Sequence, residues 1–141
     1  AKLAMEQQAA ATKKLCLENL IEVGVAYVNF AKEHPEQYKL MFGSKIESRC
    51  DHSDLMAAGI TAFSVVINRV ERGIAAGILI HEDPNILAKS CWTTVHGISS
   101  LYIDGYFQDL NYKLEDFLRK EIMLSIRGIL KDTSLLDDHF G

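Results

Sequence analysis

Trp92 and His96 are the side chains of this sequence whose types and spacing could form a binding site. They stand four residues apart in an apolar run from Ile86 to Phe107, so a helix would project both from one face. An indole and an imidazole can supply the few polar groups of a pocket with apolar walls. Gly97 would let another backbone approach closely. Packing alone is the competing interpretation, with the indole filling space between helices and His96 donating a hydrogen bond inside the core.

The five histidines show no strong metal-binding pattern. None occurs in an H-x-x-x-H or H-E-x-x-H spacing, and no cysteine lies at zinc-finger spacing, so the sequence predicts neither a metal site nor a cofactor. His52 and His81, in a chain of globin size, leave a haem-like binding protein or enzyme as the alternative all-α hypothesis. His81 precedes the helix start at Asp83-Pro84, however, whereas an axial ligand should stand on a helix that faces the haem.

Nucleophilic catalysis has little support in the sequence. Cys91, Ser99 and Ser100 lie near His96, but no third residue that would orient the histidine is evident, and no strand-turn-helix elbow precedes them. No glycine-rich phosphate loop occurs. Cys91 fits better as a small apolar core residue, and the sequence predicts that the protein is not an enzyme.

Composition restricts the class of protein further. The 141 residues, 48% of them apolar, are typical of one globular domain, and a net charge of −4 without a basic run argues against direct binding to DNA. Three cysteines without a C-x-x-C pair are typical of free thiols in a reducing cytoplasm. No apolar stretch approaches the roughly 18–20 residues of a membrane span. We therefore expect a cytoplasmic protein that does not enter the membrane.

The elements that must position Trp92 and His96 are helices, because apolar residues recur at steps of three and four and no segment alternates as a strand would. Pro35 should end the first helix and open a short second one, which Gly43 ends. Ser53 and Asp83 are N-cap residues. The expected helices cover 13–34, 35–42, 54–78, 84–107 and 112–131, with a loop at 44–52. The fold class is all-α, with five or six helices.

The helix expected at 84–107 has apolar residues on two sides. One row contains Val95, Ile98 and Tyr102, and the other contains Trp92 and His96. A helix with two apolar sides needs cover on both, by its own core and by a partner. The helix expected at 112–131 also has a wide apolar face. Elsewhere, Gly73 and Gly77 lie one turn apart and predict a smooth patch for a close helix crossing.

Several short motifs resemble the C-terminal domain of TetR-family transcriptional regulators, in the subgroup with a Trp…His-Gly helix. The motifs, spread between Leu17 and Leu130, are Ala26-Tyr27, Phe30-Ala31, His34-Pro35, Tyr38, Leu40-Met41-Phe42, Gly73, Trp92…His96-Gly97 and Leu101. The resemblance implies a helical bundle that binds a small apolar effector and forms a homodimer through its last two long helices. Effector binding would shift the connecting helix and so the spacing of the two DNA-binding domains.

In that family a helix-turn-helix domain precedes this region and ends in a Tyr-x-x-Phe-containing stretch, and no such stretch precedes Tyr27-Val-Asn-Phe30 in this sequence. We therefore expect residues 1–11 to be the remnant of the connecting helix, 12–131 the effector-binding and dimerisation domain, and 132–141 a C-terminal tail. The DNA-binding domain would be absent from this chain.

Site residues follow from the motif and from helical facing. The expected effector-binding residues are Tyr27, Phe30, Met56, Ile60, Phe63, Trp92 and His96. The expected dimer-interface residues are Val95, Ile98, Tyr102, Tyr106, Phe117, Ile122 and Ile126. A dimerisation module with a collapsed pocket and no effector remains a third hypothesis.

Overall fold

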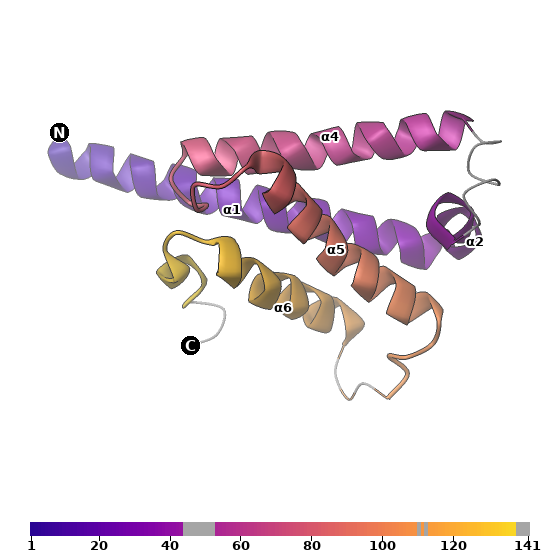
Figure 1. Cartoon of the computed structure of the whole chain (residues 1–141). Helices are drawn as coiled ribbons and strands as arrows, with labels where there is room; N and C mark the ends of the chain where they lie inside the picture. The colour runs from indigo at the N-terminus through magenta and orange to yellow at the C-terminus, as the bar shows by residue number, and fades with distance from the viewer. Residues whose placement is uncertain (44–52, 110, 112, 138–141) are drawn as a thin grey trace.

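The computed structural model describes residues 1–43, 53–109, 111 and 113–137, and helices make up nearly all of this part (Figure 1). The α-helices are α1 (Lys2–Glu33), α2 (Pro35–Tyr38), α4 (Ser53–Ala75), α5 (Pro84–Ile103) and α6 (Leu114–Ile126). A π-helical segment, η1 (Lys39–Gly43), continues α2, and two 3-10 segments follow α6: η2 (Arg127–Ile129) and η3 (Thr133–Leu136). The predicted all-α fold class is confirmed.

Local sequence signals account for several helix ends. α1 ends at Glu33 and α2 begins at Pro35, as the proline predicts. The Asp83 carboxylate accepts a hydrogen bond from the backbone N–H of Asn85 at 2.9 Å, so Asp83 is the N-cap of α5. α4 begins at Ser53, whose side chain lies outside the described part, as does the predicted loop at 44–52.

The end of α4 differs from the prediction. The helix stops at Ala75, because Gly77 adopts a φ of +78° that side chains disfavour, and the chain then turns back. The N–H groups of Ile78 and Leu79 donate to the carbonyl of Gly73 at 3.0 and 3.2 Å. A Cβ on Gly73 would lie 2.8 Å from a Leu79 methyl carbon. The two glycines therefore allow a tight turn rather than a smooth patch for helix crossing.

The helices α5 and α6 also end earlier than expected, at Ile103 and Ile126. After α5 the chain turns at Gly105, whose φ is +85°. After α6 it continues as η2 to an isolated antiparallel bridge between Leu130 and Leu79. Leu136 of η3 is fully buried and Leu135 is partly buried, so these two residues of the region expected to be a tail pack against the core.

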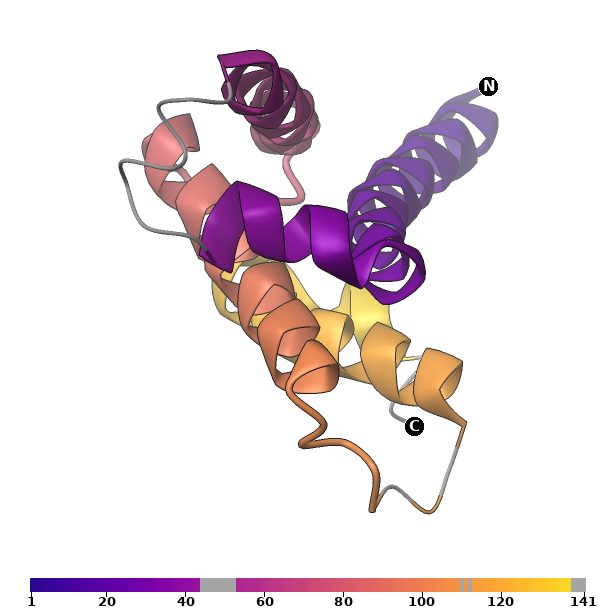
Figure 2. The same ribbon diagram turned by 90° about the vertical axis from the view of Figure 1, so that its right-hand side faces the viewer.

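The hydrophobic core lies around the second half of α1. Leu17, Ile21, Val25 and Val28 are buried there, where α1 packs against α4, α5 and α6. Figure 1 shows α4 running along α1 while α5 crosses toward α6, and Figure 2 shows α2 and η1 reaching from the end of α1 toward α5. Residues 1–15, which include the first half of α1, are exposed. No helix in the described ranges is long and apolar enough to cross a lipid bilayer.

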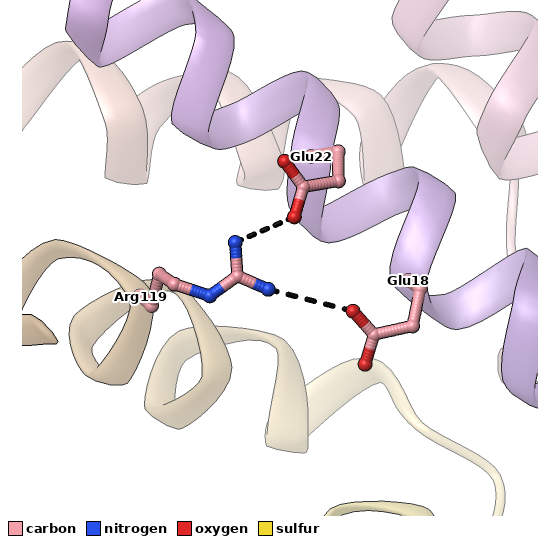
Figure 3. A network of polar contacts seen from close by, with 3 residues as sticks. All are labelled: Glu18, Glu22 and Arg119. Carbon is pink, nitrogen blue, oxygen red and sulfur yellow. Dashed lines mark hydrogen bonds and ion pairs between the residues drawn. The ribbon is translucent and has the colours of Figure 1, made fainter. Parts of the chain in front are cut away.

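An ion-pair network joins α6 to α1 (Figure 3). The guanidinium of Arg119 donates to Glu22 at 2.5 Å and to Glu18 at 3.4 Å, and these two carboxylates lie one turn apart on α1. The hydrogen bond to Glu22 raises the pKa of Arg119 further, although burial opposes this effect. The side chains are about one third to one half exposed, so the network orients the two helices more than it stabilises them.

Candidate ligand-binding site

Trp92 and His96 lie at the centre of a group of six rings, which we call the aromatic cluster. Its members are Tyr27 of α1, Tyr38 of α2, Phe42 of η1, Phe63 of α4, and Trp92 and His96 of α5. The ring centroids of Phe42 lie 5.3 Å from His96 and 6.0 Å from Trp92. Phe63 lies 5.9 Å from Trp92 on the α4 side. These separations are typical of direct aromatic contacts.

Four polar atoms of the cluster contact one another. The Trp92 Nε1–H donates to the Tyr27 hydroxyl at 3.0 Å. The two tyrosine hydroxyls lie 3.4 Å apart, and Nδ1 of His96 lies 2.6 Å from the Tyr38 hydroxyl and 3.3 Å from that of Tyr27. We call these contacts the polar relay. It connects α1, α2 and α5 at one point.

The cluster is electrically neutral near neutral pH. Burial lowers the pKa of His96, which disfavours the imidazolium. Burial also raises the pKa of Tyr27, and its hydrogen bond to Tyr38 raises it further, while the Trp92 N–H acts in the opposite direction. Next to the cluster, burial raises the pKa of Cys91 to about 11, so this thiol stays protonated and unreactive. A neutral aromatic surface with few polar atoms suits an apolar ligand better than a charged one.

The structure unites four of the seven residues predicted to bind an effector. Tyr27, Phe63, Trp92 and His96 belong to the cluster, whereas Ile60 is 69% exposed on α4. Phe30 is also exposed, and its ring contacts His34 at a centroid distance of 5.1 Å. The side chain of Met56 lies outside the described part.

Tyr38 and Phe42 are the cluster members that the site prediction missed. Both stand in the motifs that carry the family resemblance, which was the available signal. Helical facing could not select them, because α2 is only four residues long and η1 has a different helical period.

The residues predicted to form the dimer interface have mixed positions. Val95, Ile98, Ile122 and Ile126 are buried in the core of this single chain, which removes them from its surface. Phe117 packs on Phe107 with a centroid distance of 5.0 Å. The ammonium of Lys32 lies 5.9 Å from the centroid of the half-buried Tyr102 ring, and Tyr106 is 69% exposed.

A different face of the same two helices is exposed. We define the α5–α6 face by residues that recur at steps of three and four: Ser90, Thr93, Gly97 and Leu101 of α5, Leu124 of α6, and Gly128 of η2, which continues α6. Leu101 and Leu124 are 45% and 48% exposed. A Cβ placed on Gly97 or Gly128 would have no atom within 4 Å. This chain alone therefore gives no reason for glycine at either position.

Two surface hollows, of about 420 and 430 Å³, lie away from the aromatic cluster. One borders the exposed start of α1, and the other lies between the end of α1 and the turn after α5. Neither is lined by a cluster residue. Within the described ranges no group of three or more His, Cys, Asp or Glu side chains could hold a metal ion. His81 is exposed between α4 and α5, and His52 lies outside the described residues.

Residues 20–124 match the protein family described as "Tetracyclin repressor-like, C-terminal domain". The matched region is about three quarters of the chain and includes every cluster residue and all but Gly128 of the α5–α6 face. Neither a curated protein nor a solved structure matches the chain.

Proposed function

Because the chain belongs to the family of tetracyclin repressor-like C-terminal domains, we propose that it is the sensor of a bacterial transcription regulator of the Trp…His-Gly subgroup. Domains of this family are ligand-binding and dimerisation domains of regulatory proteins. The aromatic cluster receives a small, mostly apolar effector. DNA contact belongs to a helix-turn-helix domain that precedes this region in the whole protein, which acts in the cytoplasm and carries no catalytic site.

The observation that carries this proposal is the aromatic cluster itself. Trp92 is 38% exposed while its Nε1–H is held by Tyr27, so part of an oriented indole ring is open to a ligand. On α4, beyond Phe63, Ile60 presents further apolar surface. An effector that covers this surface gains about 25 cal/mol for each Å² of apolar area that it removes from water.

The cluster is suited to transmit effector binding because Tyr27 belongs to α1. A ligand that displaces Trp92 or Tyr38 breaks a hydrogen bond to Tyr27 and so acts directly on that helix. Effector and operator are then linked through the position of α1, provided that the effector binds more tightly to the arrangement that does not fit the operator.

The α5–α6 face is the surface through which we propose that two chains pair. Small residues permit two helices to approach closely, and Leu101 and Leu124 supply exposed apolar area beside them. A symmetric pair would bring α5 and α6 of both chains into one four-helix bundle. Val95 and Ile98 then hold α5 in place from the core side.

Native mass spectrometry of the purified chain tests the proposal. A dimer that carries an additional small mass supports a sensor with a retained effector. Trp92→Ala and His96→Ala should weaken binding of that effector and leave the dimer intact, whereas Leu15→Ala, at an exposed position of α1 outside the cluster and the α5–α6 face, should change neither. Loss of folding in both cluster variants favours a packing role. A visible absorption band favours the haem-like alternative, and a bare dimer whose melting temperature no compound changes favours a dimerisation module without effector.

A further inference from the structure

We infer that the polar relay fixes His96 as the tautomer with its proton on Nε2, so that the site offers a hydrogen-bond donor and selects apolar effectors with a neutral oxygen acceptor. The tautomer follows from the contacts of the relay. The selection of the effector rests in addition on the proposed function.

The direction of the relay is set at Trp92, because an indole N–H can only donate. The Tyr27 oxygen accepts this bond at 3.0 Å. The proton of Tyr27 must then point to another acceptor, and the Tyr38 oxygen at 3.4 Å and the His96 Nδ1 at 3.3 Å are within reach. Tyr27 keeps this proton because burial raises its pKa.

The short contact between Tyr38 and His96 determines the next step. N–H donors lie about 2.7–3.2 Å from an oxygen acceptor, whereas O–H donors approach to about 2.5–3.0 Å. The observed 2.6 Å fits the Tyr38 hydroxyl as donor and an unprotonated Nδ1 as acceptor. In the reverse arrangement the Tyr38 proton would have only the His96 carbonyl at 3.5 Å or the Tyr27 oxygen at 3.4 Å.

The remaining proton of a neutral imidazole must therefore sit on Nε2. Nε2 makes no hydrogen bond within the described part of the chain, and the rings of Phe42 and Trp92 flank the imidazole. A hydrogen bond to a ligand would contribute a net of about 0.5–1.5 kcal/mol, because Nε2 is not fully buried and water can bind this donor. A carbonyl or ether oxygen of an effector would satisfy it, whereas an ammonium group would oppose one donor with another. Attraction between a cation and the surrounding aromatic rings would act in the opposite direction and would favour binding of an ammonium group.

The tautomer is measured first, by long-range proton–nitrogen correlation spectra of the nitrogen-15-labelled chain at pH 7.5. Replacing the four other histidines with asparagine leaves His96 as the only histidine without changing the cluster. We expect Nδ1 to give the shift of an unprotonated nitrogen and Nε2 that of a protonated one. Tyr38→Phe should produce a mixture of tautomers, and Tyr106→Phe should not. A proton on Nδ1 in the parent chain overturns the inference.

The selection is measured with four probes that share a phenyl ring: acetophenone, ethylbenzene, 1-phenylethylamine and benzoate. Trp92 is the only tryptophan, so its indole N–H signal reports the site directly. Acetophenone should bind about tenfold more tightly than the other three, as expected for one additional hydrogen bond. His96→Leu should reduce this preference to less than about twofold.

The outcomes separate the two proposals. Tightest binding of the amine or of benzoate overturns the inference but supports an effector site. If no probe shifts the Trp92 signal while Nε2 carries the proton, the selection fails together with the effector site, and the relay remains as a structural feature of the fold.

Discussion

Tyr38 of α2 and His96 of α5 are joined by a 2.6 Å contact between a phenol oxygen and Nδ1, although 58 residues separate them in the sequence. A four-residue helix has little stability of its own. Tyr38 is the buried residue of α2, and its ring also lies 5.1 Å from that of Phe42. These contacts attach α2 and η1 to α5, and Tyr27 extends the same network to α1.

Tyr38→Phe tests the strength of this attachment. The ring remains and the hydroxyl is lost, so we expect the free energy of unfolding to fall by about 1 kcal/mol. The pKa of His96 should rise toward its ordinary value, because the bond from Tyr38 favours the unprotonated Nδ1. Urea unfolding and a proton NMR titration measure the two effects. Tyr106→Phe is the matched control and should alter neither, and an unchanged His96 pKa in Tyr38→Phe would contradict the assigned donor.

The lowered pKa of His96 predicts a pH dependence of stability. In the unfolded chain this histidine titrates near pH 6.5, whereas in the folded chain it titrates lower. Between these values the unfolded state binds more protons, so the contribution of His96 is complete above about pH 6.5 and is lost as the pH falls toward the folded-state pKa. His96→Gln cannot take up the proton. The difference in unfolding free energy between the two proteins should therefore change across this interval and level off outside it, and a constant difference would show that burial does not disfavour the imidazolium.

Features of the fold that depend on neighbouring residues could be predicted from the sequence, whereas features that depend on tertiary packing could not. Pro35 and Asp83 act on adjacent residues, and the spacing of Trp92 and His96 is a property of one helix, so the sequence alone predicts these features. The pairing of Tyr38 with His96 depends on where α2 packs against the rest of the fold. The periodicity of apolar residues in the sequence does not give this position. The end of α4 at Ala75 depends likewise on the turn at Gly77 and its contacts with Leu79.

Several residues of the predicted interface lie in the core of the single chain, for a related reason. Periodicity finds two apolar sides on α5 but does not say which side faces the core of the same chain. Val95 and Ile98 face this core, and the opposite side carries small residues such as Gly97. The large apolar side chains fill the interior of the protomer, and the exposed face that suits a partner has a weaker hydrophobic signal.

The network of Arg119, Glu18 and Glu22 should contribute little to stability. The side chains are 30–56% exposed, and pairs of this kind contribute about 0.2–1 kcal/mol. A double-mutant cycle with Arg119→Gln and Glu22→Gln should give a coupling energy in this range that falls in 0.5 M salt, because ions screen exposed charges. The cycle with Glu18→Gln should give a smaller value, since that contact is longer. A coupling energy above about 2 kcal/mol that salt does not change would indicate a buried pair instead.

Ser99→Ala should stabilise the chain. Ser99 is fully buried on α5, and its Oγ has no hydrogen-bond partner in the described part. Removing an unsatisfied hydroxyl should raise the free energy of unfolding by about 1 kcal/mol. Ser125→Ala on α6 is the control, because its hydroxyl pairs with Thr94 at 2.5 Å while the gain in helix propensity is the same. Destabilisation by Ser99→Ala, measured by chemical denaturation, would reveal a partner for that hydroxyl.

Gly97→Ala should have opposite effects on the stability of one chain and on the association of two chains. Within the protomer the new methyl group meets open space, so helix propensity should stabilise α5 by about 1 kcal/mol. At a close helix crossing the same methyl group would force the two chains apart, at a cost of about 1–3 kcal/mol and therefore a roughly 10- to 100-fold higher dimer dissociation constant. Sedimentation equilibrium gives this constant, and chemical denaturation gives the stability. Gly59→Ala on α4, where a Cβ also meets no atom within 4 Å, should stabilise the chain without changing the dissociation constant, and Leu124→Glu should produce monomers that remain folded. Equal dissociation constants for Gly97→Ala and Gly59→Ala would exclude the α5–α6 face as the interface.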